Sequence, residues 1–178
     1  RDNNGEAYWY NFDIESQHIL DAKSLFQRSN EIIIESLDTF KEELDNVLDP
    51  EKEPLIKFKY HNSDIKKSVV NMIVEMPAII QINSIWHGFD DTLASIIQAH
   101  VSNHMINETS ALNVIGYKRT HPLEDKYLFT ISFNPKHNLG GVDIDEKTKT
   151  SAIVQELSQA CDELSSIFGE IMKSGMGM

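Results

Sequence analysis

The sequence predicts an α+β domain in which long amphipathic helices pack on one face of an antiparallel sheet. Two long segments, 22–48 and 148–173, place apolar residues at helical spacing. Between them lie short segments of alternating or β-branched residues, the pattern of strands. The chain has 178 residues, of which 40% are hydrophobic, which is enough for one ordinary domain or for two very small units that share a core.

The first fifty residues predict a strand followed by a long helix. Residues 8–14 alternate between aromatic or aliphatic and polar side chains, which is typical of a half-buried strand. Asp21 offers an N-cap oxygen for a helix that starts at Ala22 and continues to about Leu48. Asp49 and Pro50 end that helix. Its apolar stripe consists of Phe26, Ile33, Leu37, Phe40, Leu44 and Val47.

The middle of the chain predicts several strands and one helix. Residues 88–91 break the strand pattern and cap a helix that runs to about Met105, with Leu93, Ile96, Ile97, His100, Val101 and His104 on one face. A turn is expected at 61–64 and a loop at 106–110. The expected strands are 55–60, 68–74, 78–85, 111–118 and 126–133, and 78–85 is more convincing than 68–74.

The last helix is expected from about Thr148 to Lys173, with Ile153, Leu157, Ala160, Leu164, Phe168 and Ile171 as its stripe. Each long helix needs a partner for its stripe, and the simplest partner is the other long helix or its equivalent in another chain. The expected organisation is a strand–helix unit at 1–49, a linker at 50–54, a second unit at 55–173 and a frayed tail at 174–178.

Composition argues against several classes of function. The net charge is −12, from 16 basic and 28 acidic residues, and there is no clustered basic stripe, so direct nucleic-acid binding is not expected. No apolar run approaches the roughly eighteen residues that cross a membrane. The single cysteine, Cys161, excludes an internal disulfide and a multi-cysteine zinc site. Because the sequence opens without an initiator Met or a signal peptide, we expect it to begin inside a longer polypeptide.

Three features could carry chemistry, and each also has a structural interpretation. His100 and His104 are spaced as metal ligands on a helix would be, but Val101 stands where the HExxH pattern needs Glu, and no metal is expected. His121 precedes Pro122 between two strands, without a nucleophile or oxyanion hole beside it, so a turn residue is expected. The Asp90–Asp91 pair is better explained by capping of the helix that follows than by a Mg²⁺ site.

Two motifs resemble the smaller α-like subunit of archaeal and eukaryotic RNA polymerases. WHGFDDTLASII (86–97) is similar to the family's Asp-His-Thr-Leu-Gly-Asn helix start, through Asp90, Thr92 and Leu93. GYKRTHPLEDKYLFTISF (116–133) is similar to its Gly-Tyr-x-x-Pro-His-Pro-Leu-Glu connection, with Thr120 in place of the first Pro. The agreement runs from about Leu55 to Lys173. Residues 1–49 resemble more loosely the end of the larger α-like subunit, through Glu15 and Ser16.

The resemblance implies a fusion of both α-like subunits, as in RNA polymerases of large cytoplasmic DNA viruses. It implies an RNA polymerase α-dimerisation-like fold and a non-catalytic assembly platform without cofactors. The expected partners are the two large catalytic subunits and an upstream α-like half. The location would be a cytoplasmic viral factory or virion, or otherwise the nucleus. The residues expected at subunit interactions are Phe26, Ile33, Leu37, Phe40, Leu44, Asp90, Thr92, Leu93, Tyr117, His121, Pro122, Leu123, Glu124, Leu157, Leu164 and Phe168.

Two alternatives remain open. A stand-alone dimerisation or adaptor module would share the apolar stripes but would not copurify with large polymerase subunits. A small metal-dependent hydrolase would need His100 and His104 as ligands, which a metal assay on the purified protein would reveal.

Overall fold

The computed structural model describes residues 13–17, 20–60, 69–75, 80–82, 85–87, 90–121, 126–138 and 144–175. Three helices and two antiparallel sheets make up this part of the chain, in agreement with the predicted α+β class. In chain order the elements are α1 (Ala22–Leu48), β1 (Ile56–Tyr60), β2 (Val69–Val74), β3 (Ile80–Ile82), β4 (Ile85–His87), α2 (Asp91–His100), the π-helical turn η1 (Val101–Met105), β5 (Leu112–Arg119), β6 (Tyr127–Phe133) and α3 (Glu146–Gly175).

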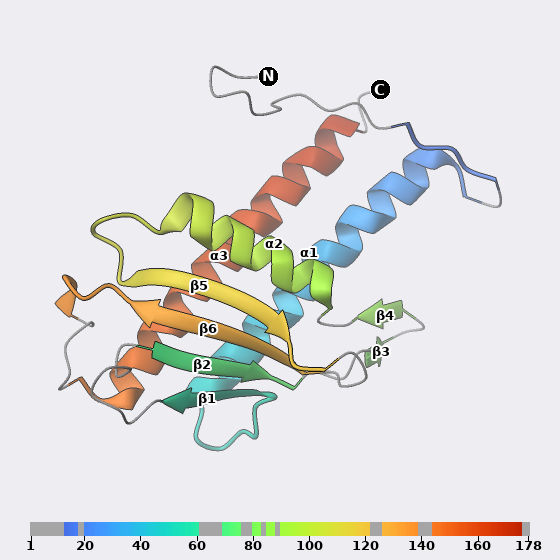
Figure 1. Cartoon of the computed structure of the whole chain (residues 1–178). Helices are drawn as coiled ribbons and strands as arrows, with labels where there is room; N and C mark the ends of the chain where they lie inside the picture. The colour runs from blue at the N-terminus through green and yellow to red at the C-terminus, as the bar shows by residue number, and fades with distance from the viewer. Residues whose placement is uncertain are drawn as a thin grey trace.

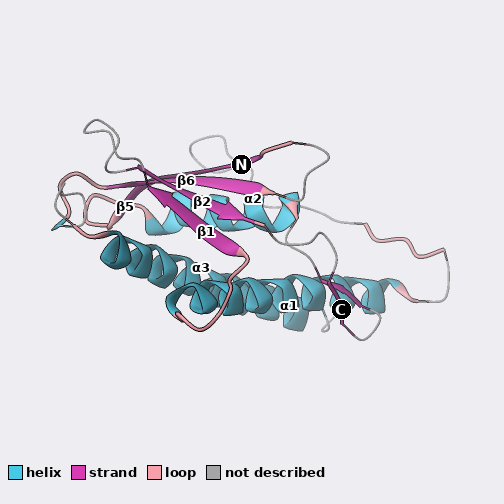
Figure 2. Cartoon of the chain, turned by 90° about the horizontal axis from the view of Figure 1, so that it is seen from below, coloured by secondary structure: helices cyan, strands magenta, loops and turns pink. Residues whose placement is uncertain are grey.

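The main sheet has four strands in the order β1-β2-β6-β5, and every neighbouring pair is antiparallel. Helices α1 and α3 lie side by side on one face of this sheet, as both Figure 1 and Figure 2 show. Helix α2 lies beside β5 and also contacts α3. The opposite face of the sheet carries none of the described helices. The structure is therefore a two-layer arrangement with its core between the helices and the sheet.

Each helix begins where an aspartate caps its first turn. The Asp21 carboxylate accepts a hydrogen bond from the Ser24 amide at 2.8 Å, and that of Asp90 accepts one from the Leu93 amide at 2.8 Å. Both caps were predicted and are confirmed. The Asp145 carboxylate accepts from the Thr148 amide at 2.6 Å, so α3 starts at Glu146, two residues before the predicted start.

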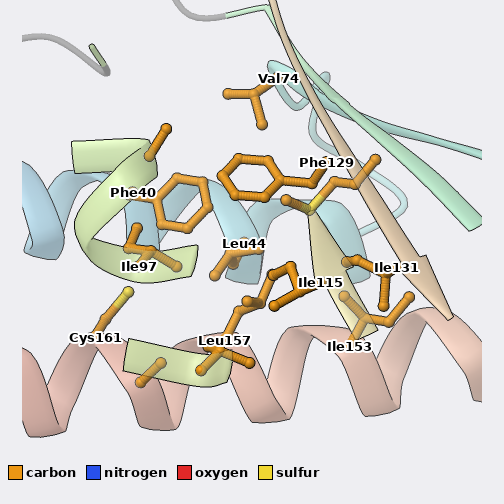
Figure 3. Close-up of a cluster of buried hydrophobic side chains, with 14 of the residues drawn as sticks. Phe40, Leu44, Val74, Ile97, Ile115, Phe129, Ile131, Ile153, Leu157 and Cys161 are labelled. Atoms are coloured by element: carbon orange, nitrogen blue, oxygen red, sulfur yellow. The ribbon is translucent and has the colours of Figure 1, made fainter. Parts of the chain in front are cut away.

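The core collects the alternate, inward-facing residues of the strands and the stripes of all three helices. Phe40 and Leu44 from α1 meet Phe129 from β6 and Leu157 from α3 in the buried cluster of Figure 3. Cys161 from α3 belongs to the same cluster, and burial raises the pKa of its thiol to about 12. A thiol buried in this way stays protonated, so it acts as a small apolar core residue, as predicted.

The prediction of one strand at 78–85 is wrong. Two three-residue strands, β3 and β4, form a separate hairpin that is not part of the main sheet. The residues between them, Asn83 and Ser84, are of types that favour turns, and such residues can divide a β-branched run. The strand at 68–74, judged less convincing, instead occupies the centre of the main sheet as β2.

Three further predictions need correction or fall at least partly outside the described residues. Of the strand predicted at 8–14, only Asp13 and Ile14 are described; neither lies in a strand, and Ile14 is 46% exposed. The helix predicted to run to Met105 is α-helical only to His100, and η1 completes it. His104, predicted on the apolar face, is exposed. The turn expected at 61–64 lies outside the described residues.

Candidate functional site

The antiparallel pair of α1 and α3 brings together half of the predicted interaction residues. Near the middle of the pair, Nζ of Lys41 lies 2.5 Å from the carboxylate of Asp162. At one end, the aromatic ring of Phe26 approaches the backbone of Gly175 so closely that a side-chain carbon at Gly175 would lie 2.3 Å from a ring carbon. The two predicted stripes therefore meet within one chain.

Burial divides this helix pair into two halves. In the half covered by the sheet, Leu37, Phe40 and Leu44 of α1 and Leu157 and Leu164 of α3 are buried, with at most 5% of each side chain exposed. Contacts between these residues form the core of this chain, so none of them is a free surface for another subunit.

The other half of the helix pair projects beyond the sheet (Figure 1). We call this half the overhang. It comprises residues 20–33, which are the start of α1 and the two residues before it, together with residues 167–175 of α3. Ile33 and Phe168, both predicted interaction residues, are only partly buried at its base. The large exposed apolar side chains on it are Leu20, Leu25, Ile167 and Ile171, between 39% and 50% exposed.

The two motifs quoted above come together at the start of α2. The Tyr117 hydroxyl on β5 donates a hydrogen bond to the Asp91 carboxylate, and Nη1 of Arg119 lies 3.6 Å from the same carboxylate. Burial, followed by this hydrogen bond, raises the pKa of Tyr117 to about 12. The sequence assigned the Asp90–Asp91 pair only to capping, whereas Asp91 also ties α2 to β5. Of the other motif residues, Leu93 is buried and Thr92 is exposed.

His121 lies just beyond the end of β5 and is exposed to solvent. The ends of the connection that contains it are held together by Thr120, whose amide and hydroxyl both donate to the Lys126 carbonyl at 3.1 Å. Pro122, Leu123 and Glu124, predicted as interaction residues, lie outside the described residues. The role of His121 as a turn residue stays a prediction.

His100 has a partner that the sequence did not predict. Its Nε2 atom lies 2.8 Å from the Glu163 carboxylate of α3, and only 7% of the imidazole is exposed. This carboxylate comes from α3, which is distant in the sequence, so the spacing of His100 and His104 did not indicate it. The His104 ring lies 5.2 Å from the His100 ring, centroid to centroid. Among the described residues, no group of three or more His, Cys, Asp or Glu side chains is placed to hold a metal ion.

The Glu163–His100 contact predicts a pH-dependent contribution to stability. Hydrogen bonds from Gln159 and then His100 lower the pKa of Glu163 below its ordinary value of 4.5. An acid whose pKa is lowered by folding stabilises the fold above its unfolded pKa, and that contribution is lost as pH falls through the folded pKa. The difference in unfolding free energy between the natural chain and Glu163→Gln should therefore shrink between about pH 6 and pH 3.

Urea unfolding of both proteins across this pH range measures that difference. Glu42→Gln, at an exposed position of α1, is the matched control, and its difference from the natural chain should change less over the same range. A Glu163→Gln difference that stays constant as the pH falls would contradict the assignment.

Comparison with models of known protein families and with curated proteins finds no match for this chain. Among the helices that the structure describes, none combines the length and the apolar character that crossing a bilayer requires.

Proposed function

We propose that this chain is a non-catalytic assembly-platform subunit of a multisubunit DNA-directed RNA polymerase, in which two α-like units are fused. The observation that carries the proposal is the asymmetric cover of the α1–α3 pair. One sheet buries the stripes over one half of the pair, while the overhang keeps four large apolar side chains more than a third exposed. Exposed apolar surface of this kind marks a protein contact.

The expected occupant of the overhang is the sheet of the upstream α-like half. Such a sheet would cover the overhang as β1-β2-β6-β5 covers the other half, and the helix pair would then stand at the centre of a pseudo-symmetric dimer. The sequence supports this occupant through its resemblance to the ends of the larger and the smaller α-like subunits. The two large catalytic subunits would assemble on the completed dimer.

The connection between the two units fits a fusion. Only seven residues, Asp49 to Leu55, separate α1 from β1, and the Leu55 amide donates a hydrogen bond to the Glu43 carboxylate at 3.0 Å. A short tether makes the association intramolecular, at an effective concentration of roughly millimolar. The fused chain would act in a viral factory or virion if it is viral, and otherwise in the nucleus.

The proposal is tested at the overhang by co-expression with the upstream half and the large subunits of the same polymerase. Leu25→Asp and Ile171→Asp place a charge on the overhang, so each should weaken copurification of the upstream half and the large subunits by about tenfold or more. Leu48→Asp is the matched control, because Leu48 is 45% exposed at the opposite end of α1. It should leave assembly unchanged.

Assembly that tolerates both overhang charges would contradict the proposal. If the chain instead dimerised through the overhang and bound no polymerase subunit, the stand-alone dimerisation module would be the better assignment. That second candidate is favoured by the same exposed side chains, and only the identity of the bound partner separates the two.

A further inference from the structure

The face of the main sheet that points away from α1 and α3 presents ordered rows of side chains to solvent. Opposed residues of antiparallel strands point to the same face, so the register places Lys57, Ile73, Leu128 and Lys118 in one row across all four strands. The next row contains Lys59, Asn71, Thr130 and Gly116. Figure 1 looks onto this face, and no described helix crosses it.

The middle of this outer face mixes aliphatic side chains with the small polar Asn71 and Thr130, and lysines lie at both edges. Val69, Ile73 and Leu128 lie on the central strands β2 and β6 and are partly exposed. Lys57 and Lys59 on one edge strand and Lys118 on the other are exposed. Four strands spaced about 4.8 Å apart put the two lysine edges roughly 14 Å from each other.

Charge is segregated between the two layers of the molecule. The four strands of the main sheet contain four basic residues and no acidic residue. In contrast, α1 contains six acidic and three basic residues, and α3 contains five and three. Three of the four basic residues, Lys57, Lys59 and Lys118, lie on the outer face, so in a chain of net charge −12 this face is a local basic surface.

Two lysines at this face already pair with a carboxylate of the chain itself. The Glu75 carboxylate, directly after the end of β2, lies 3.4 Å from the ammonium groups of Lys57 and Lys126. Hydrogen bonds from Lys126 and then Lys57 lower the pKa of Glu75. Lys59 and Lys118 form no ion pair with any residue that the structure describes. These two lysines remain to pair with carboxylates from outside the chain.

We propose that this face docks an acidic amphipathic helix from a partner protein. A helix is about 10–12 Å across, so one that lies along β2 and β6 would cover the two central strands. Its apolar stripe would pack on Ile73 and Leu128, and glutamates on its two flanks would reach Lys59 on one side and Lys118 on the other. This surface is separate from the overhang, and the inference does not depend on the proposed function.

A nucleic acid fits this face less well than a protein does. Single-stranded nucleic acids bind open sheets by stacking their bases on aromatic side chains. The aromatic residues of these strands point to the core side, as Phe129 and Tyr127 show by their burial, and the outer rows are aliphatic or small polar. Aliphatic side chains between lysines instead suit an apolar stripe with carboxylates beside it.

The test uses the full chain and a synthetic helical peptide of about 20 residues, with one leucine stripe flanked on both sides by glutamate. A second peptide carries lysine in place of every glutamate. Fluorescence anisotropy measures affinity, and NMR of the ¹⁵N-labelled chain locates the site. We expect the glutamate peptide to bind and to shift amide signals of β2 and β6, and the lysine peptide to bind at least about tenfold more weakly.

Two variants decide whether the edge lysines are responsible. The double change Lys59→Glu and Lys118→Glu should weaken binding of the glutamate peptide by at least about tenfold, whereas Lys173→Glu, in the last turn of α3, should leave it unchanged. Circular dichroism confirms that both variants are folded.

Four results would overturn the inference: no binding of the glutamate peptide, equal binding of both peptides, an affinity that the double change leaves intact, or peptide-induced shifts confined to α1 and α3. A single-stranded oligonucleotide that binds the same strands and competes with the peptide would assign the face to nucleic acid instead. A dimer of the chain that the double change dissociates would assign it to a second copy.

Discussion

Replacing Leu37 with aspartate should leave the chain without its cooperative fold. The Leu37 side chain is completely buried between α1, the sheet and α3, in the half of the helix pair that the sheet covers. A carboxylate there would be cut off from water, and the surrounding cluster is apolar. The cost should be at least about 5 kcal/mol, which is comparable to the whole stability of a typical domain.

Circular dichroism and a thermal or urea unfolding transition measure this outcome. The matched control is Leu25→Asp, the same change on the same helix, at a side chain that is 39% exposed on the overhang. It should keep the cooperative transition while weakening assembly, as argued above. A Leu37→Asp protein with an unfolding transition close to that of the natural chain would contradict the placement of α1 against the sheet.

Replacing Phe40 with alanine should destabilise the fold by about 3–5 kcal/mol without abolishing it. Phe40 is among the largest fully buried side chains, and it lies where α1, α2 and the sheet meet (Figure 3). Removing the ring leaves a cavity that three rigid elements cannot collapse to fill, so both the transfer free energy and the lost packing contribute.

Urea unfolding at equilibrium measures the loss, provided that the slope of the transition is unchanged. Phe40→Leu keeps most of the apolar volume and should cost less. Phe26→Ala provides a second control, because the Phe26 ring is only partly buried on the overhang, where it lies against Gly175 at the end of α3. If Phe26→Ala and Phe40→Ala cost the same, the division of the helix pair into a covered and an uncovered half would be wrong.

These predictions rest on features that differ in how well the sequence anticipates them. The span of α1, the N-caps at Asp21 and Asp90, and the two strands on either side of His121 were all predicted, and the structure confirms them. Each depends on residues a few positions apart, through helical or alternating periodicity or through one side chain that caps a nearby amide.

The contacts at the candidate sites were less predictable. Nothing near His100 in the sequence points to Glu163, which is 63 positions away, and nothing near Asp91 points to Tyr117 on another element. The run at 78–85 has strong strand propensity, yet its residues contribute to a separate hairpin, while the weaker candidate at 68–74 forms β2, which pairs on both of its edges. Strand propensity measures fitness for a half-buried pleated surface, and it does not choose the partner strand.

The sequence by itself determined the two long helices and their apolar stripes, the two strands on either side of His121 and the acidic balance of the chain. Only the tertiary structure decided that the sheet covers one half of the α1–α3 pair and that lysines line the edges of its outer face. The physical reason is that periodicity and capping act within a few residues. The choice of neighbours, in contrast, is set by the packing free energy of the whole chain, which no short segment contains.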